Sequence, residues 1–156
     1  MMEFKDVFEK FDIFNGLDET EKKHIAGLLK RMSFKEDEEI YKEDEDGGTL
    51  YFLTNGKVRI CKMSTEGDIL PYALVKSGEM FGLMSFVDGS KHSAIALADK
   101  DCEAVKLERR DVEELMEQDP KMAAKVYKVI AIHLAEIIRS MNNQYMDLTS
   151  YMFRKG

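Results

Sequence analysis

The chain has 156 residues, of which 44% are hydrophobic and 34% charged, and its formal net charge is −7 at pH 7. This balance suits one globular domain that buries roughly two-thirds of its unfolded surface, and it argues against wholesale disorder. The negative charge argues against non-specific binding to nucleic acid or an anionic membrane. Much of the charge comes from the acid-rich stretch 36–46, which we interpret as a solvated hairpin edge, with a docking site for a basic partner as the alternative.

The cysteines and the start of the chain indicate where the protein is found. Cys61 and Cys102 stand far apart in apolar, strand-like runs. They are too few for a disulfide framework and predict reduced core residues. The first residues lack the basic and apolar pattern of a signal peptide, and no stretch reaches the ~20 apolar residues of a membrane span. We therefore expect a cytoplasmic protein without membrane contact.

Residues 4–32 are expected to form short helices. Asp18, followed three residues later by Glu21, is typical of a helix N-cap. Apolar residues then recur at helical spacing: Ile25, Leu28, Leu29 and Met32. The N-terminal part is thus predicted to be helical as far as about residue 32.

Over residues 33–107 the hydrophobic period becomes that of short strands. The expected strands are 40–41, 50–53, 58–61, 69–75, 79–81, 92–98 and 102–107. Gly47-Gly48 and Asn55-Gly56 mark turns, and Asn-Gly between apolar runs is a strong signal for a hairpin. Short strands at this spacing, with one small helical insertion, predict a jelly-roll barrel.

Residues 109–152 are expected to form two helices. A helical pattern over 111–117 is followed by Asp119-Pro120, which is typical of an N-cap and a first helical residue. From Pro120 the pattern continues to about Met152 without Gly or Pro, a helix of about 50 Å at 1.5 Å per residue.

The long helix carries a heptad seam. Apolar residues alternate in steps of four and three: Tyr127, Ala131, Leu134, Ile138, Met141, Tyr145, Leu148 and Met152. This pattern predicts a parallel homodimer, because a seam this long exceeds what one barrel covers. The expected interface consists of Leu134, Ile138, Met141, Tyr145 and Leu148. The alternative is a helix that folds back onto its own domain.

The stretch 82–95 reads Gly-Leu-Met-Ser-Phe-Val-Asp-Gly-Ser-Lys-His-Ser-Ala-Ile. It resembles the phosphate-binding cassette of cyclic-nucleotide-binding domains, Gly-Glu-(Leu/Met)-small-Leu, then about six residues, then Arg-(Ser/Thr/Ala)-Ala. In that family the Glu holds the ribose 2′-hydroxyl and the Arg pairs with the cyclic phosphate. The spacing is kept, with Gly82 ten residues before His92, but Leu83 stands at the Glu position and His92 at the Arg position.

Further segments resemble the sensor domain of the catabolite-activator family. They are 14–17 (Phe-Asn-Gly-Leu), 39–44 (Glu-Ile-Tyr-Lys-Glu-Asp), 50–58 (Leu-Tyr-Phe-Leu-Thr-Asn-Gly-Lys-Val) and 78–82 (Gly-Glu-Met-Phe-Gly). The resemblance covers about 11–146. It implies a single domain over 1–156, mainly β with flanking helices: a cupin-like jelly-roll β-barrel (double-stranded β-helix) and a long C-terminal dimerisation helix.

The chain departs from the family pattern at two kinds of position. Asp37 and Asp44 replace glycines usual in the second-strand hairpin, and Asp tolerates left-handed backbone better than most residues. The sequence also stops at Gly156, without the helix-turn-helix that follows the long helix in the transcription factors. We therefore expect a stand-alone domain that does not bind DNA.

The resemblance implies a set of ligand-binding residues: Gly82, Leu83, Met84, His92, Ser93, Ala94 and Asn142. Backbone amides after Gly82 would attract an anion. The permanent charge and bidentate hydrogen bonding of an arginine are missing, because His92 stands in its place and is mostly neutral near pH 7. Leu83 is expected to make the floor of the pocket more apolar. Loss of both charged contacts should lower affinity roughly 100- to 10,000-fold.

Three outcomes stay open for the pocket: binding of cAMP or cGMP at useful strength, a different less polar or anionic ligand, or a vestigial pocket filled by its own side chains. A rival register would take Gly78-Glu79 as the start of the cassette. It would put Asp88 opposite the phosphate, which electrostatics disfavours.

The sequence offers no grouping for catalysis or for a metal. His24, His92 and His133 lie on separate segments, and no nucleotide-binding loop or dinucleotide motif occurs. We expect a non-enzyme without a cofactor, acting as a regulatory or sensor domain. The alternative is a dimeric protein-interaction module, with the acidic hairpin or the tail 151–155 as surfaces for a protein partner.

Overall fold

The structure is a computed structural model that describes residues 4–154. The helical elements are α1 (Lys5–Lys10), the short 3-10 helix η2 (Asp12–Phe14), α2 (Glu19–Ala26), α3 (Leu83–Asp88), α4 (Arg109–Gln118) and α5 (Pro120–Arg154). The strands are β1 (Lys30–Phe34), β2 (Glu39–Tyr41), β3 (Thr49–Asn55), β4 (Lys57–Met63), β5 (Ile69–Lys76), β6 (Met80–Phe81), β7 (Ile95–Ala98) and β8 (Cys102–Glu108).

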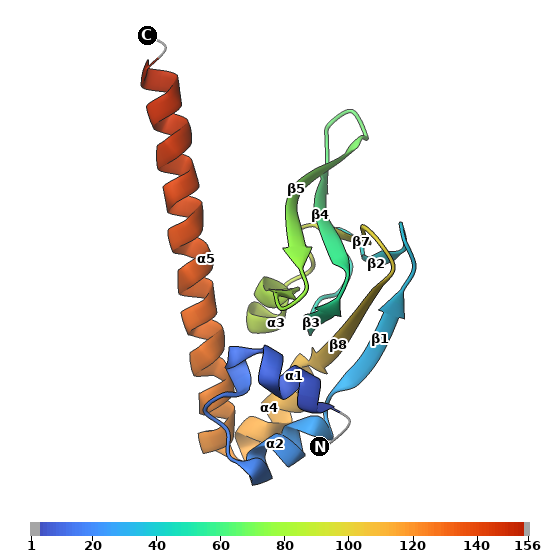
Figure 1. Cartoon of the computed structure of the whole chain (residues 1–156), viewed down its shortest axis with the longest axis vertical. Coiled ribbons are helices and arrows are strands. Elements are labelled where there is room, and N and C mark those ends of the chain that lie inside the picture. Colours follow the sequence, from blue (N-terminus) through green and yellow to red (C-terminus); the bar gives the residue numbers. More distant parts are fainter. Residues whose placement is uncertain (1–3, 155–156) are drawn as a thin grey trace.

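The strands form two antiparallel sheets that pack into a jelly roll. One sheet has the order β1-β8-β3-β6 and the other has the order β2-β7-β4-β5. Inward-facing residues of both sheets form one core cluster, in which Leu53, Val58 and Ala104 are almost fully buried. Short helices lie at one end of the barrel, and α5 projects away from it (Figure 1). The predicted mainly β fold with flanking helices is confirmed.

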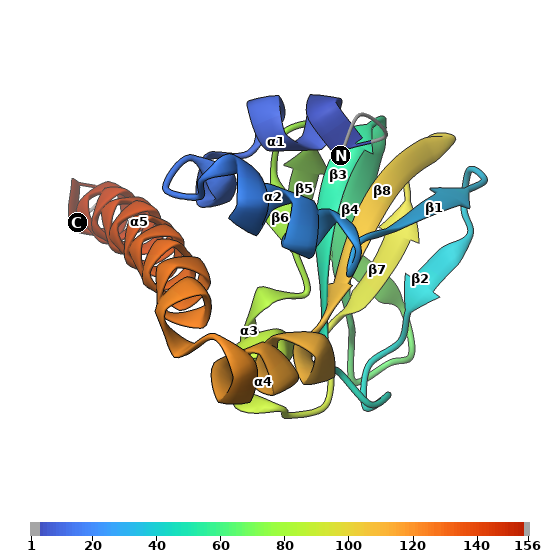
Figure 2. The same ribbon diagram turned by 90° about the horizontal axis from the view of Figure 1, so that it is seen from below.

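A second core cluster joins the helices to the barrel. The rings of Phe8 and Phe14 meet edge to face with centroids 5.0 Å apart, and Phe14 lies 5.3 Å from Phe52 of β3. The buried residues Val126 and Ile130 of α5 belong to the same cluster. Figure 2 shows α1 and α2 on one side of the barrel and α4 between the barrel and the start of α5. The helices therefore pack on the barrel through this second cluster, which is separate from the barrel core.

The predicted caps are present. The amide of Glu21 donates to Oδ1 of Asp18 (2.9 Å) and the amide of Asp18 donates to Oε2 of Glu21 (2.8 Å), which closes a capping box at the start of α2. The amide of Met122 donates to Oδ1 of Asp119 over 3.1 Å, so Asp119 caps α5.

The left-handed backbone expected at two aspartates is also found, since φ is +64° at Asp37 and +66° at Asp44.

Two sequence-based predictions differ from the structure. The α2 helix ends at Ala26 and β1 begins at Lys30, so Met32 lies in a strand and not in a continuing helix. Asn55-Gly56 is a turn, with φ at Gly56 of +89°, but the strands on either side belong to different sheets. The Asn-Gly pair therefore carries the chain from one sheet to the other, and the paired hairpin is β4–β5, which follows it.

The long helix α5 is covered only near its start. Met122, Ala123, Val126 and Ile130 are buried, whereas the side chains from Glu136 to Tyr145 are exposed. Figure 1 shows this distal part standing clear of the barrel. In the single chain the apolar residues of the heptad seam beyond Leu134 are thus exposed.

Candidate functional site

The region that resembles the phosphate cassette is a tight turn followed by the short helix α3. Gly82 has φ of +76° and precedes α3, and Gly89, with φ of +71°, ends it. A Cβ at Gly82 would lie 2.6 Å from the carbonyl oxygen of Thr49 and 3.2 Å from the ring of Tyr51. Only glycine combines this backbone conformation with this close approach. The segment therefore needs glycine at both ends of the helix.

The rival register has a different use for its acidic residues. Glu79 accepts a hydrogen bond from the amide of Lys76 (2.7 Å) within the turn between β5 and β6. Asp88 accepts one from the amide of Ser90 (2.8 Å) at the end of α3. Both carboxylates stabilise local turns.

His92 is buried inside the barrel, with 6% of its surface exposed. Its ring stacks on Tyr41 with centroids 3.6 Å and planes 4° apart, and its Nδ1 lies 3.3 Å from Oγ of Ser85. Burial lowers the pKa of His92, while the charge of Glu45 opposes this effect. The imidazole is therefore held neutral at pH 7, and it does not supply the positive charge of an arginine.

Aromatic side chains continue from His92 through the barrel interior. Tyr51 stacks on Phe81 at 4.8 Å, and the ring of Tyr41 lies 6.1 Å from Tyr51 and 6.2 Å from Phe81. Burial raises the pKa of both tyrosines, so their hydroxyls remain protonated. These residues were missed by sequence reasoning. The available signal was their position on the inward face of β2 and β3, since Tyr41 belongs to the barrel core.

The other predicted ligand-binding residues are spread over different environments. Leu83 is buried with Phe86 in the core cluster that also contains residues of the N-terminal helices and of α5. Met84 is 68% exposed, and Asn142 is exposed on α5. Ser93 is exposed, and its carbonyl oxygen accepts a hydrogen bond from Nζ of Lys62 (2.7 Å).

Gly82, His92 and the buried Ala94 are thus the predicted residues that remain in or beside the barrel interior.

The cassette is wedged between a loop and the helix that follows the barrel. The amide of His92 donates to the carbonyl of Glu45, and the amide of Asp44 donates to the carbonyl of His92, both over 2.9 Å. Gly47 packs so closely against Ser85 that a Cβ there would overlap it. The loop that follows β2 therefore closes one side of the site.

Arg109 closes the other side of the cassette. Its guanidinium lies against Gly89 so closely that a Cβ at Gly89 would overlap it. Nη2 of Arg109 pairs with Glu113 at 2.8 Å, and the amide of Arg109 donates to the carbonyl of Gly48 over 2.7 Å. The end of α3 is therefore tied directly to α4, which packs on α5.

The acid-rich stretch 36–46 is largely compensated within the chain. Its ion pairs are Glu36 with Lys100, Asp37 with Arg59, Glu39 with Lys42 and Glu43 with Lys62. Glu38 and Glu45 accept hydrogen bonds from the amides of Lys35 and Lys42. These contacts support the interpretation of the stretch as a solvated edge.

Within residues 4–154, no three His, Cys, Asp or Glu side chains are grouped so that they would hold a metal ion. No helix in the same part of the chain combines the length and apolarity needed to cross a membrane.

The two-sheet jelly roll, the short helix between β6 and β7 and the long terminal helix define the class of jelly-roll domains with flanking helices. Residues 31–119 match the model of the family described as Cyclic nucleotide-binding domain, and the chain belongs to this family.

Similar proteins fall in the same class. The Cyclic AMP receptor protein of Thermus thermophilus is 31% identical over 80% of this chain and 57% of its own length. The CRP-like cAMP-activated global transcriptional regulator of Mycobacterium tuberculosis is 23% identical over 92% of this chain and 62% of its own length. The chain thus spans about three-fifths of these curated relatives.

Among solved structures, a cyclic nucleotide-binding domain from Methylobacillus flagellatus matches with a TM-score of 0.81 and 22% identity. That match covers 92% of this chain and 82% of the other chain, and it supports the fold.

Proposed function

We propose that this chain is a non-catalytic, cytoplasmic regulatory domain whose degenerate cassette binds cAMP or cGMP weakly or with altered specificity. The observation that carries the proposal is the burial of His92 in a stack with Tyr41, at the position where the family pattern has an arginine. A neutral imidazole that stacks on another side chain offers a phosphate neither a positive charge nor the paired hydrogen-bond donors of a guanidinium.

The aromatic interior supports the same proposal. Tyr41, Tyr51 and Phe81 pack with His92 and Ser85 on the side of the barrel where the cassette lies. A polar, charged nucleotide would have to separate these rings and lose their mutual burial. We infer that any ligand of this site either is less polar than a cyclic nucleotide or displaces the His92 ring.

The test is calorimetric titration of the purified protein with cAMP, cGMP and cyclic dinucleotides, together with the His92→Arg variant. We expect millimolar binding by the wild type, and a gain of roughly 10- to 100-fold for His92→Arg, because one charge-assisted contact is restored. Lys91→Arg is the matched control, since it places the same side chain one residue away on an exposed position. Micromolar binding by the wild type would contradict the proposal.

Leu83→Glu is less informative alone. Leu83 lies in the helical core, and a carboxylate there would be buried without a partner that the structure shows. The double variant with His92→Arg therefore needs a folding check by circular dichroism before its affinity is interpreted.

We also propose that the chain forms a homodimer through α5. The seam residues Ile138, Met141, Tyr145 and Leu148 are exposed in the single chain, between 56% and 69%, which is typical of a helix face covered by a partner. Dimerisation without ligand binding would favour the second candidate function, a protein-interaction module with a vestigial pocket. Measurable binding by the wild type that is strengthened in His92→Arg supports the sensor domain, whereas undetectable binding by both proteins supports the interaction module.

A further inference from the structure

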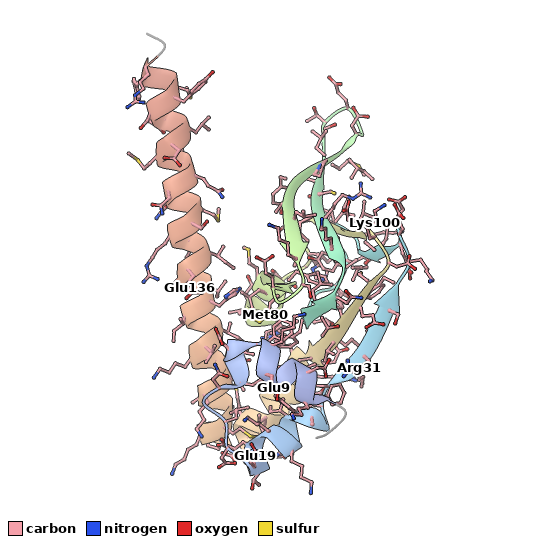
Figure 3. The ribbon with its side chains drawn as sticks, in the orientation of Figure 1. Glu9, Glu19, Arg31, Met80, Lys100 and Glu136 are labelled. Atoms are coloured by element: carbon pink, nitrogen blue, oxygen red, sulfur yellow. The ribbon has the colours of Figure 1, made fainter. Side chains whose placement is uncertain are left out.

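A pocket opens at one end of the sheet that contains β1, and it is separate from the cassette. It has a volume of about 250 Å³ and lies where β1 and β3 end and β8 begins. None of its lining residues belongs to the stretch 82–95. In Figure 3 the labelled Lys100 lies near this end of the sheet, whereas Arg31 lies toward the other end of β1. The pocket is therefore a second candidate site.

The pocket lies on the side of the barrel away from α5. In Figure 1 and Figure 2 the end of β1 and the start of β8 are on the opposite side of the barrel from the long helix. No residue of the heptad seam lines the pocket. Occupation of the pocket is thus independent of the proposed dimer and of ligand binding at the cassette.

Three hydrogen-bond acceptors lie side by side across the strands that form the pocket. Glu103 of β8 is the register partner of Ser33 in β1 and of Asn55 in β3. Side chains that stand directly opposite each other in a sheet are about 5 Å apart. Among residues 4–154, none of these three side chains makes a hydrogen bond or an ion pair with another residue. A carboxylate, an amide oxygen and a hydroxyl are thus available to one ligand.

The charges around the pocket favour a cation. Nζ of Lys35 pairs with Oδ2 of Asp101 at 2.8 Å, and the amide of Glu36 donates to Oδ1 of Asp101 over 3.0 Å. The charge of Asp101 is therefore compensated within the chain, whereas that of Glu103 is not. An anion would meet this uncompensated carboxylate, while a cation would neutralise it, and the net charge of −7 attracts cations to the whole surface.

The arrangement of the acceptors favours a planar cation over a point charge. A metal ion is disfavoured, because residues 4–154 contain no group of three His, Cys, Asp or Glu side chains that would hold one. An ammonium group presents three donors from a single atom, whereas a guanidinium presents five donors in one plane and binds a carboxylate through two of them. A row of acceptors on neighbouring strands matches the planar group.

The floor and the size of the pocket suit an arginine side chain. The floor contains Phe34 and Cys102, which are both buried, so it offers apolar surface to a methylene stem. Pockets that hold drug-sized ligands start at about 300 Å³. A volume of about 250 Å³ is therefore suited to a group as small as one side chain.

We propose that this pocket binds a guanidinium group, with Glu103 as its charged partner and Ser33 and Asn55 as flanking acceptors. The guanidinium belongs either to a small molecule or to an arginine of a protein partner, and the chemistry of recognition is the same for both. The site therefore gives the domain a second input that needs neither a nucleotide nor the cassette.

The test is a titration of the isotope-labelled protein followed by amide NMR. The probes are acetyl-arginine-amide, agmatine and acetyl-lysine-amide. We expect saturable shifts at residues 33, 55 and 103 with a dissociation constant near about 1 mM for the better guanidinium probe. Acetyl-lysine-amide should bind at least about 10-fold more weakly, because it lacks the paired donors.

Two matched variants assign the contact. Glu103→Gln should weaken binding of the guanidinium probes at least about 10-fold, because it removes the charged acceptor and keeps the shape of the side chain. Glu114→Gln removes the same charge from an exposed position on α4, outside the pocket, and should change the affinity by less than about 2-fold. Ser33→Leu is a further variant that obstructs the pocket without a change in charge, and the NMR spectrum of each variant reports its folding.

The same titrations distinguish the source of the guanidinium and the failure of the proposal. Tighter binding of agmatine supports a small molecule, and tighter binding of acetyl-arginine-amide supports an arginine of a protein partner. Absence of saturation up to about 20 mM would overturn the proposal. Equal binding of the lysine probe, or equal weakening by Glu103→Gln and Glu114→Gln, would also overturn it, because the acidic protein would then attract cations without a specific site.

Discussion

The ring of His92 lies face to face on the ring of Tyr41, with centroids 3.6 Å apart and planes nearly parallel. The two residues come from β2 and from the segment before β7, and the amide of His92 is bound to the loop that follows β2. The stack therefore joins the cassette to the second sheet. It also keeps a titratable group in a place where its charged form is poorly solvated.

Stability is expected to fall with acidification because of His92. Burial depresses the pKa of His92 in the folded protein below its ordinary value of 6.5. At a pH between the pKa of His92 in the folded protein and its pKa in the unfolded chain, the unfolded chain binds more protons than the folded protein. The free energy of unfolding is therefore highest above about pH 6.5, and it falls as the pH decreases toward the pKa of the folded protein.

Urea unfolding between pH 7.5 and about 5 measures this slope. His92→Gln should flatten it, and the exposed His24→Gln should retain it. An identical slope in wild type and His92→Gln would assign the effect to other groups.

Gly82→Ala should destabilise the protein by about 2 to 4 kcal/mol, because a Cβ would meet the Thr49 carbonyl in addition to adopting left-handed backbone. Gly67→Ala is the matched control. Gly67 has φ of +90° but nothing within 4 Å of its Cβ position, so only the backbone cost of about 1 to 2 kcal/mol applies. Chemical denaturation of both variants measures the difference. An equal decrease in the free energy of unfolding for the two variants would show that the turn before α3 adjusts to a side chain at residue 82.

Local signals predicted the elements well but not their partners. Periodicity located most of the barrel strands and α5, and the resemblance to a family with glycine at these positions implied the left-handed turns at Asp37 and Asp44. Asn55-Gly56 was predicted as a hairpin because its local signal specifies a turn, whereas the pairing of β3 with β8 and β6 is decided by contacts distant in sequence.

The candidate site was predicted less completely. Leu83 and Phe86 are three residues apart, so the phase of α3 places both in the helical core and turns Ser85 toward His92. The partner of His92 could not be predicted, because Tyr41 lies far away in the sequence.

Asp44→Gly should stabilise the fold slightly. Asp44 has φ of +66°, which costs an L-residue free energy and costs glycine little. The gain is reduced by the greater freedom of glycine in the unfolded chain, so we expect about 0.5 kcal/mol of net stabilisation. Asp46→Gly is the control, because Asp46 lies two residues away without positive φ and should lose about 0.5 to 1 kcal/mol. Thermal and urea unfolding of the two variants measure the change in the free energy of unfolding. A decrease in both variants would show that the Asp44 side chain stabilises the turn.

Met141→Asp should convert the proposed dimer into a monomer. Met141 lies at the centre of the exposed seam, where a carboxylate from each copy would face its counterpart without solvent or a partner. We expect the dissociation constant to rise at least about 100-fold, from the cost of burying unpaired charge.

Ile132→Asp is the matched control for the seam. Ile132 is an exposed apolar residue on the same helix, and it is rotated about 170° from the middle of the seam. It should therefore leave the mass in solution unchanged. Sedimentation equilibrium of the two variants at several concentrations decides between the alternatives for α5. If Met141→Asp and Ile132→Asp have the same mass as the wild type, α5 lies outside the interface, and the exposed seam then requires a partner other than a second copy.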